Sequence, residues 1–177
     1  MLSGVMTVEL TFSGVRAKGG AHVPLQLEVP PPHFTQEEGY TMSPLQFRGH
    51  ARYEDGAVAL FGTLRFTVTR PCVRCLKPFT ETIEADLQER FVQGTPPQTD
   101  ALVENADFEW IPTDEIPLVE ILHEWARILP DPFGLCQKDC KGLCPVCGTD
   151  LNVAMCACER DRIDPRLAGL KAFFEKH

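Results

Sequence analysis

Long apolar runs and the common catalytic motifs are both missing from this sequence. No stretch approaches the ~20 apolar residues that a membrane span needs, so we expect no membrane segment. Residues 1–10 lack the basic stretch and apolar core of a secretory signal, which favours a cytoplasmic location. The motifs GxxxxGKS/T, GxGxxG, GxSxG and HExxH are absent as well. Because no pattern sets a nucleophile beside a base, we expect no enzyme, no catalytic residues and no small-molecule substrate.

Charge is unevenly distributed along the chain. The 177 residues have a formal net charge of −8 and a hydrophobic content of 44 %, which is enough for a real core. Residues 45–80 hold six Lys/Arg and two acids, whereas residues 81–125 hold twelve acids and one Arg. One region is suited to phosphate and the other to a basic partner, although an ordinary solvated surface can show the same asymmetry.

Alternating apolar residues predict a long β-hairpin. Apolar side chains alternate from Leu45 to Tyr53 and again after Asp55-Gly56, a dipeptide that favours a two-residue hairpin turn. Pairing across that turn gives the apolar pairs Tyr53–Val58, Ala51–Leu60 and Phe47–Leu64. Alternation also predicts strands over residues 5–13 and 25–29, and a third long strand over residues 79–91.

Two helices are expected in the second half of the chain. One begins at Thr113 or Asp114, which can cap it, and ends at Leu129-Pro130. The other begins at Asp164-Pro165. We therefore predict an α+β fold with an antiparallel, open or barrel-like sheet, a long hairpin, two C-terminal helices and a Cys-rich zinc knuckle between them. Residues 1–130 would form the β-rich core domain with its closing helix, and residues 131–177 a zinc-binding tail with the C-terminal helix.

Six of the eight cysteines lie within 23 residues, and their spacing predicts metal binding. They are Cys136, Cys140, Cys144, Cys147, Cys156 and Cys158. The central CPVCG sequence has the form of a zinc knuckle, which supplies two of four tetrahedral ligands. The second pair could come from Cys136/Cys140 or from Cys156/Cys158, or all six could share two ions. No histidine lies in this run, so a closed structural zinc site is favoured.

Other roles for the cysteines are weaker. A disulfide framework does not suit a cytoplasmic protein, in which thiols stay reduced, and no βαβ pattern supports a thioredoxin-type redox site. Cys72 and Cys75 form a second CxxC pair at a corner between strands. They are less favoured as zinc ligands: they could complete the main cluster or form a buried structural pair.

The polar face of the predicted hairpin is a candidate RNA-binding surface. It gathers Arg48, His50, Arg52 and Arg65, with Phe61 among them. Basic side chains around an aromatic ring can hold RNA through phosphate contacts and base stacking. The alternative is an ordinary outer face of a sheet.

Four segments resemble one known family. They are residues 72–78 (CVRCLKP), 121–130 (ILHEWARILP), 139–152 (DCKGLCPVCGTDLN) and 164–171 (DPRLAGLK). Together they resemble the YceD family, the large ribosomal RNA subunit accumulation proteins, over roughly residues 45–175. The resemblance implies a bacterial or plastid factor that supports the level of large-subunit (23S) ribosomal RNA without enzymatic activity.

The same resemblance suggests the partners. A binding factor of this kind would contact a large-subunit ribosomal protein, ribosomal RNA or both. Some members of the family lack the C-terminal cysteines, which implies that zinc here holds the tail in place. The alternatives are an RNA-processing nuclease, for which the scattered acids of residues 81–125 give no motif, and a thiol-redox protein that uses the CxxC pairs.

Overall fold

The computed structural model describes residues 9–33, 40–95 and 108–159. The chain divides into two compact units. Unit 1 comprises Met1–Arg70 and Phe79–Pro132, and unit 2 comprises Pro71–Pro78 and Phe133–His177. Unit 2 therefore draws on two stretches of chain that are far apart in sequence, and all eight cysteines belong to it.

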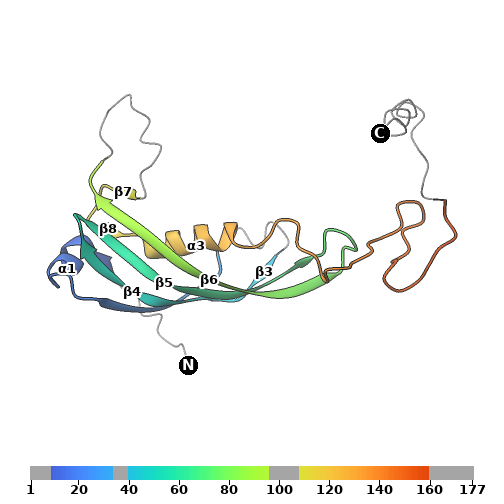
Figure 1. Cartoon of the computed structure of the whole chain (residues 1–177), viewed down its shortest axis with the longest axis horizontal. Helices are drawn as coiled ribbons and strands as arrows, with labels where there is room; N and C mark the ends of the chain where they lie inside the picture. Colours follow the sequence, from blue (N-terminus) through green and yellow to red (C-terminus); the bar gives the residue numbers. More distant parts are fainter. Residues whose placement is uncertain (1–8, 34–39, 96–107, 160–177) are drawn as a thin grey trace, which may run out of the picture. The chain divides into compact units, whose positions relative to one another are not determined.

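The described part of unit 1 is mostly sheet, with two helices (Figure 1). In chain order, the elements are β1 (Leu10–Thr11), α1 (Phe12–Arg16), β2 (Val23–Val29), β3 (Thr41–Met42), β4 (Leu45–Glu54), β5 (Ala57–Pro71), β6 (Pro78–Gln93), β7 (Glu109–Ile111), β8 (Glu115–Ile116) and α3 (Leu118–Ile128). None of the helices in the described ranges is long and apolar enough to cross a lipid bilayer.

The main sheet is mixed and open. Its strand order is β2-β4-β5-β6-β7, with β3 paired to β5, and β1 and β8 form a separate two-stranded sheet. The prediction of a purely antiparallel sheet is wrong in one place, because β7 runs parallel to β6. A parallel neighbour needs a connection of about a dozen residues or more, and residues 94–108 provide that length. Within the described residues β2 and β7 stand at the two edges, so the sheet does not close into a barrel.

The β4–β5 hairpin has the pairs that the alternation gives. Phe47 lies opposite Leu64, and the antiparallel register continues to Tyr53 opposite Val58 beside the turn. The turn residue Asp55 has φ 49° and is followed by Gly56 at φ 83°. Two consecutive positive φ angles suit the right-handed twist of a two-residue hairpin, which explains the Asp-Gly sequence.

One apolar core lies between the sheet and α3. Four buried residues at helical spacing line the inner side of α3: Leu118, Ile121, Leu122 and Ala126. They belong to one cluster with buried sheet residues such as Phe47 and Phe91. The helix lies along one face of the sheet (Figure 1), so this face is covered and the opposite face of β4–β6 is the outer one.

The predicted start of α3 was four to five residues too early. The helix begins at Leu118 after Pro117, which makes no side-chain cap. Asp114, the expected cap, instead accepts hydrogen bonds from the backbone N–H (3.0 Å) and hydroxyl (2.5 Å) of Ser13. The Asp114 carboxylate, which the local pattern predicts as a helix cap, is therefore bonded to Ser13 near the start of the chain. The second helix, expected from Asp164, lies outside the described residues.

The predicted strand over residues 5–13 is also shorter than expected. In the described part of that segment, only Leu10–Thr11 is extended, and α1 begins at Phe12. The Thr11 hydroxyl accepts a hydrogen bond of 3.1 Å from the backbone N–H of Gly14, so Thr11 caps α1. An alternating pattern cannot reveal that a cap of this kind redirects the chain.

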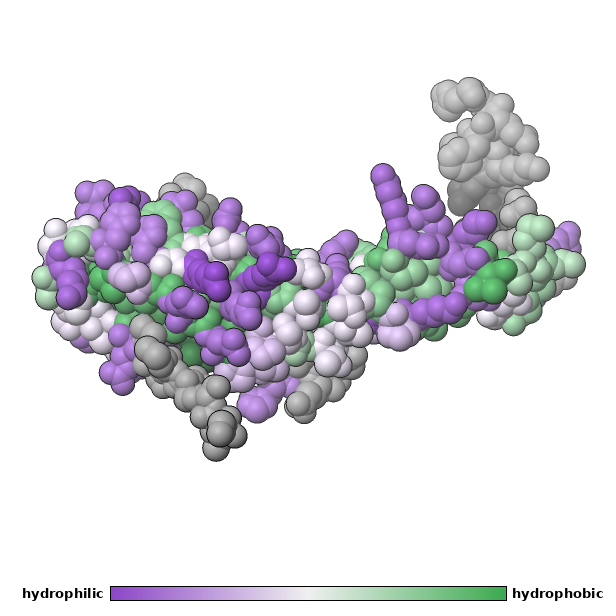
Figure 2. Space-filling model, turned by 90° about the horizontal axis from the view of Figure 1, so that it is seen from below, coloured by the Kyte–Doolittle hydropathy of each residue, from purple (hydrophilic) through white to green (hydrophobic). Residues whose placement is uncertain are grey.

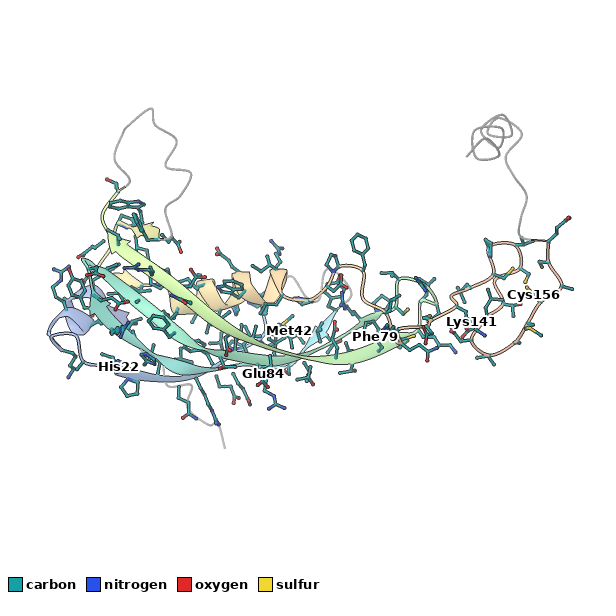
Figure 3. All side chains as sticks on the ribbon, viewed as in Figure 1. His22, Met42, Phe79, Glu84, Lys141 and Cys156 are labelled. Atoms are coloured by element: carbon teal, nitrogen blue, oxygen red, sulfur yellow. The ribbon has the colours of Figure 1, made fainter. Side chains whose placement is uncertain are left out.

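The outer face of the sheet is polar. Seen from below the view of Figure 1, hydrophilic side chains cover much of unit 1, with hydrophobic ones between them (Figure 2). In Figure 3, Met42 points to the side of the sheet on which α3 lies, whereas His22 and Glu84 lie on the opposite side. The candidate RNA-binding residues belong to this outer face.

Candidate metal centres

The eight cysteines gather into two groups of four. We define group 1 as Cys72, Cys75, Cys136 and Cys140, and group 2 as Cys144, Cys147, Cys156 and Cys158. Within each group, all four sulfur atoms lie within 4.8 Å of one another. Cys72 and Cys75 thus join Cys136 and Cys140, and the other four of the six clustered cysteines form a group of their own.

Group 1 combines a tight loop with a distant stretch of chain. The backbone N–H of Cys72 donates to the Lys77 carbonyl, and the N–H of Leu76 donates to the Cys72 carbonyl, both over 2.9 Å. These bonds fold residues 72–77 into a tight knuckle, in which the Cys72 and Cys75 sulfur atoms lie within 4.8 Å of each other. Cys136 and Cys140 come from the segment that follows α3, more than sixty residues later.

Group 2 repeats the same knuckle. The backbone N–H of Cys144 donates to the Thr149 carbonyl over 2.8 Å, and the N–H of Gly148 donates to the Cys144 carbonyl over 2.9 Å. Cys156 and Cys158 complete the group from only a few residues further on. This is the CPVCG knuckle of the sequence. The loop at Cys72 and Cys75 has the same two backbone hydrogen bonds at the corresponding positions.

The sulfur separations fit zinc and do not fit disulfides. The Cys72 and Cys140 sulfur atoms are 3.8 Å apart, and those of Cys75 and Cys136 are 3.6 Å apart. A tetrahedron of sulfurs about 2.3 Å from zinc has edges of about 3.8 Å, whereas a disulfide bond is about 2.05 Å long. The donor set of each group consists of thiolates alone, which suits a closed structural zinc site.

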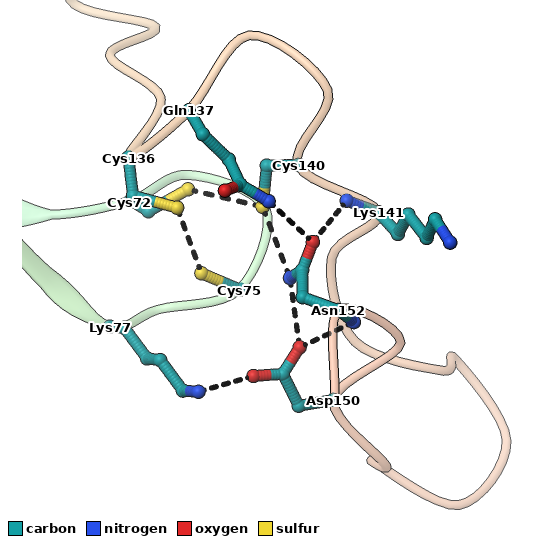
Figure 4. Close-up of polar contacts among 9 residues, drawn as sticks. All are labelled: Cys72, Cys75, Lys77, Cys136, Gln137, Cys140, Lys141, Asp150 and Asn152. Carbon is teal, nitrogen blue, oxygen red and sulfur yellow. Dashed lines mark hydrogen bonds and ion pairs between the residues drawn. The ribbon is translucent and has the colours of Figure 1, made fainter. Parts of the chain in front are cut away.

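Polar groups surround the sulfurs of group 1 (Figure 4). The Asn152 side-chain N–H group donates to the Cys140 sulfur over 3.4 Å. The Asn152 side-chain oxygen accepts from the backbone N–H of Lys141 over 2.8 Å. The Asp150 carboxylate accepts from the Asn152 backbone N–H over 2.9 Å and pairs with the Lys77 ammonium at 2.6 Å. Hydrogen bonds to ligating atoms are typical of metal sites, in which they orient the ligands.

The thiols of group 1 differ in acidity. Burial disfavours the Cys72 thiolate, yet backbone N–H groups of Cys136, Cys75 and Arg74 lower its pKa to about 6. Burial and then the neighbouring thiols raise the pKa of Cys136 to about 12. Four adjacent thiolates repel one another, and a divalent cation among them would remove that repulsion.

Group 2 shows the same contrast. Hydrogen bonds from the Thr149 hydroxyl and backbone lower the pKa of Cys147 to about 6. The hydrogen-bonded Cys147 sulfur and then burial raise the pKa of Cys158 to about 12. The Thr149 hydroxyl lies 3.1 Å from the Cys147 sulfur, so Thr149 supports group 2 much as Asn152 supports group 1.

The four candidate RNA-binding residues share the outer face of β4 and β5. Arg48, His50 and Arg52 alternate along β4, and Arg65 lies opposite Gln46, a neighbour on the same face. Two of the arginines have acidic partners. Arg52 pairs with Glu54 at 2.6 Å, and Arg65 lies 3.7 Å from Glu84.

Phe61 is covered rather than free for base stacking. The His50 ring stacks on it with centroids 5.5 Å apart, and the Arg52 guanidinium lies 5.3 Å from its centroid. The His22 ring continues the stack, 4.2 Å from that of His50. Burial, then the charges of His22 and Arg52, lowers the pKa of His50. Within the described residues, Arg48 is the one of these arginines with neither an ion pair nor a ring contact.

A depression on the same face has a mixed lining. Gln46, Arg48, Thr63, Arg65 and Glu84 surround it. Thr63 donates to the Asp86 carboxylate over 2.8 Å, so acidic groups of β6 lie beside the arginines of β4 and β5. The face carries both signs of charge, which the sequence pattern of the hairpin alone did not indicate.

The chain combines a mixed sheet with two groups of four cysteines. These features define a class of small, cysteine-rich proteins that have the donor sets of structural metal centres. A family model described as "Large ribosomal RNA subunit accumulation protein YceD" matches residues 60–174, well over half of the chain. The chain belongs to the YceD family.

The chain is also similar to uncharacterized proteins of Mycobacterium bovis and Mycobacterium tuberculosis. The relative from M. bovis and two from M. tuberculosis strains are each 32 % identical over 114 residues. The aligned region covers 64 % of this chain and 54 % of each relative, so the chain spans about half the length of the curated relatives it matches. No solved structure matches this chain.

Proposed function

We propose that this protein is a non-enzymatic, cytoplasmic ribosome-biogenesis factor that supports the accumulation of large-subunit (23S) ribosomal RNA. The observation that carries this proposal is the family match over residues 60–174. The chemistry of the cysteine groups is consistent with it, because sulfur-only tetrahedral sites are saturated and serve to hold chain segments together.

The factor acts by binding a large-subunit ribosomal protein, ribosomal RNA or both. A basic protein partner is favoured by the twelve acids of residues 81–125, several of which lie on β6. Glu84 and Asp86 stand beside the arginines of the outer face, where they would repel phosphate. Direct RNA contact would therefore depend most on Arg48, with smaller contributions from His50, Arg52 and Arg65.

Zinc is the structural cofactor in this proposal. Each ion would be held by four thiolates and would supply a cross-link between segments of unit 2. Group 1 would join the Cys72–Cys75 knuckle to Cys136 and Cys140. Group 2 would close the stretch from Cys144 to Cys158. The ions stabilise the surface that unit 2 presents and take no part in a reaction.

A pull-down from lysate tests the binding role and separates the two kinds of partner. The tagged chain is recovered with and without ribonuclease treatment, and bound proteins and RNA are identified. We expect a large-subunit ribosomal protein that stays bound after ribonuclease. Loss of all ribosomal material after ribonuclease would instead assign binding to RNA, and recovery of none in either sample would contradict the proposal.

Variants of the outer face sharpen this test. Arg48→Gln should weaken any RNA binding more than Arg65→Gln, because Arg65 already has Glu84 as a partner. Binding through phosphates should also fall steeply with added salt, as counterion release requires. Glu84→Gln is the matched control: it should leave RNA binding unchanged or improved while weakening a basic protein partner.

The two enzymatic alternatives have distinct signatures. A nuclease would cleave RNA in the presence of a divalent metal such as Mg²⁺. A thiol-redox protein would interconvert dithiol and disulfide forms of a CxxC pair and would lose that activity when zinc is bound. Cleavage of RNA with Mg²⁺ present, or catalysed thiol exchange by the zinc-free chain, would replace the binding proposal with one of these.

A further inference from the structure

The loop that belongs to group 2 also supports group 1. Residues 148–155 connect Cys147 to Cys156, both of them members of group 2. Three residues in the middle of this loop, Asp150, Leu151 and Asn152, contact the surroundings of group 1 instead. The segment is therefore held at its ends by one set of four sulfurs and bonded at its centre to the other.

Asn152 makes the most direct of these contacts. Its side-chain N–H group donates to the Cys140 sulfur over 3.4 Å (Figure 4). Its side-chain oxygen accepts from the backbone N–H of Lys141 (2.8 Å) and from the side chain of Gln137 (3.2 Å). Gln137 precedes Cys140 in the chain and Lys141 follows it, so Asn152 contacts the Cys140 sulfur, the backbone after it and a side chain before it.

Asp150 fixes Asn152 and reaches the first knuckle. Its carboxylate accepts from the backbone N–H and the side-chain N–H of Asn152, over 2.9 and 2.8 Å. Its other oxygen pairs with the Lys77 ammonium at 2.6 Å. Lys77 closes the first knuckle, because its backbone carbonyl accepts a hydrogen bond from the backbone N–H of Cys72. The loop thus contacts both halves of group 1.

Backbone bonds join the same two regions. The N–H of Leu151 donates to the Gly142 carbonyl over 2.9 Å, and Leu143 forms a β-bridge with Asp150. The N–H of Leu143 donates to the Arg74 carbonyl over 3.2 Å. Arg74 lies between Cys72 and Cys75, and its guanidinium donates to the Cys140 carbonyl over 2.8 Å. A continuous network therefore runs from one group to the other.

We propose that the two groups are separate metal sites that bind their ions cooperatively, with Asn152 as the positioning residue that couples them. This inference rests on the proposed zinc role. A metal ion in group 2 orders the loop of residues 148–155, and the ordered loop presents the Asn152 N–H group to Cys140. The metal ion in group 1 then binds a sulfur whose orientation and charge are already stabilised.

The coupling is reciprocal. If an ion in group 2 raises the affinity of group 1 by some factor, an ion in group 1 raises the affinity of group 2 by the same factor. Hydrogen bonds to metal ligands typically change metal affinity by about 10- to 100-fold. We therefore expect the lower end of that range, about tenfold, for the single Asn152–Cys140 contact.

A double-mutant cycle on the full chain tests this coupling. Both groups are loaded with cadmium, a sulfur-binding stand-in for zinc that gives each site its own NMR resonance, and a chelator is added in steps. The four chains are wild type, Asn152→Ala, Cys156→Ser/Cys158→Ser, and the combination. Because each resonance is followed separately, the chelator concentration that empties group 1 gives its affinity in every chain.

The cycle should be strongly non-additive. Asn152→Ala should lower the affinity of group 1 about tenfold when group 2 is intact, and less than about twofold in the Cys156→Ser/Cys158→Ser chain. Equal losses in both backgrounds, or no loss in either, would overturn the coupling. Met155→Ala is the matched control, because the Met155 side chain in the same loop is 94 % exposed, and it should leave both affinities within about twofold.

A second variant tests the chemistry of the contact itself. Asn152→Asp keeps an oxygen that can accept from Lys141 but removes the N–H donor to the Cys140 sulfur. It should lower the affinity of group 1 at least as much as Asn152→Ala, because a carboxylate repels thiolate. Wild-type affinity in this variant would overturn the role of the N–H group. If neither group in the wild-type chain retains metal against the chelator, the zinc proposal fails as well; two retained ions with an additive cycle overturn the coupling alone.

Discussion

Leu76 adopts the backbone conformation after Cys75 that Gly148 adopts after Cys147. Their φ angles are 61° and 74°, and both N–H groups donate to the carbonyl of the first cysteine of their knuckle over 2.9 Å. Left-handed backbone is ordinary for glycine and costs roughly 1 kcal/mol for a residue with a side chain. The first knuckle therefore holds a leucine in a position that favours glycine.

Substitutions at Leu76 should reveal this strain. The Leu76 side chain is 64 % exposed, so Leu76→Gly loses little burial and should change unfolding stability by less than about 1 kcal/mol. Leu76→Val should lower it by about 1–2 kcal/mol, because a β-branched side chain tolerates positive φ least. Chemical denaturation of the zinc-loaded chain measures both. Equal effects of glycine and valine would show that backbone conformation does not matter here.

Counting metal ions tests the division of the cysteines. Native mass spectrometry of the purified chain should find two zinc ions, because each group of four sulfurs can satisfy one ion. Cys72→Ser/Cys75→Ser should retain one ion and so should Cys144→Ser/Cys147→Ser. If the first of these variants still held two ions, Cys72 and Cys75 would not be ligands.

The hairpin shows what the sequence alone could specify. Its register follows from a period of two and an Asp-Gly turn, and both are local signals. The pairs Phe47–Leu64 and Tyr53–Val58 could therefore be named in advance. The need for glycine at the paired positions Gly49 and Gly62 could not be predicted in the same way. It arises because the Phe47 ring occupies the space that a Cβ atom at either position would take.

The features that sequence reasoning missed depend on distant contacts. The local pattern predicts Asp114 as a possible helix cap, but its hydrogen-bond partner Ser13 is 101 residues away. The parallel position of β7 likewise depends on a return of the chain that no local pattern encodes.

The grouping of the cysteines shows the same limit. Their spacing identified the CxxC pairs, but Cys72 and Cys140 are 68 residues apart and only folding brings them together. One local signal was available: CVRCLK and CPVCGT share the spacing of a knuckle, although leucine stands where glycine is expected. Cys72 and Cys75 are less favoured as metal ligands from the sequence because they lie far along the chain from the other six cysteines.

The Gly62 position should not tolerate a side chain. A Cβ atom there would lie 2.4 Å from the Cζ atom of the buried Phe47 ring and 2.6 Å from the Arg48 carbonyl oxygen. Gly62→Ala should therefore lower the free energy of unfolding by about 1–3 kcal/mol through overpacking. Phe47→Leu in the same chain should recover part of that loss, because it removes the ring atoms that clash. The four stabilities come from denaturant unfolding, and strict additivity would contradict the packing account.

The Asp150 carboxylate predicts a pH profile. The hydrogen bond from the Lys77 ammonium, and then those from Asn152, hold the pKa of Asp150 at about 2, below its ordinary value of 3.8. Because the folded-state pKa is lowered, the stabilisation is present above the unfolded-state pKa and is lost as pH falls toward 2. Asp150→Asn should therefore weaken unit 2 by a constant amount between pH 6 and about pH 8, with the difference reduced by added salt.

Chelator resistance of the zinc-loaded chains, measured across that pH range, checks this expectation. Glu159→Gln removes a carboxylate from the same unit and serves as the control for net charge. A difference between Asp150→Asn and wild type that grew with salt, or that varied strongly within this pH range, would contradict the ion-pair account.

The ratio of large-subunit to small-subunit ribosomal RNA tests the central claim most directly. It is measured in cells from which this protein has been depleted and in the same cells supplied with the wild-type chain. The account predicts that depletion lowers the ratio and that the wild-type chain restores it, whereas a Cys72→Ser/Cys75→Ser chain restores it less. An unchanged ratio after full depletion would contradict the proposed role in ribosomal RNA accumulation.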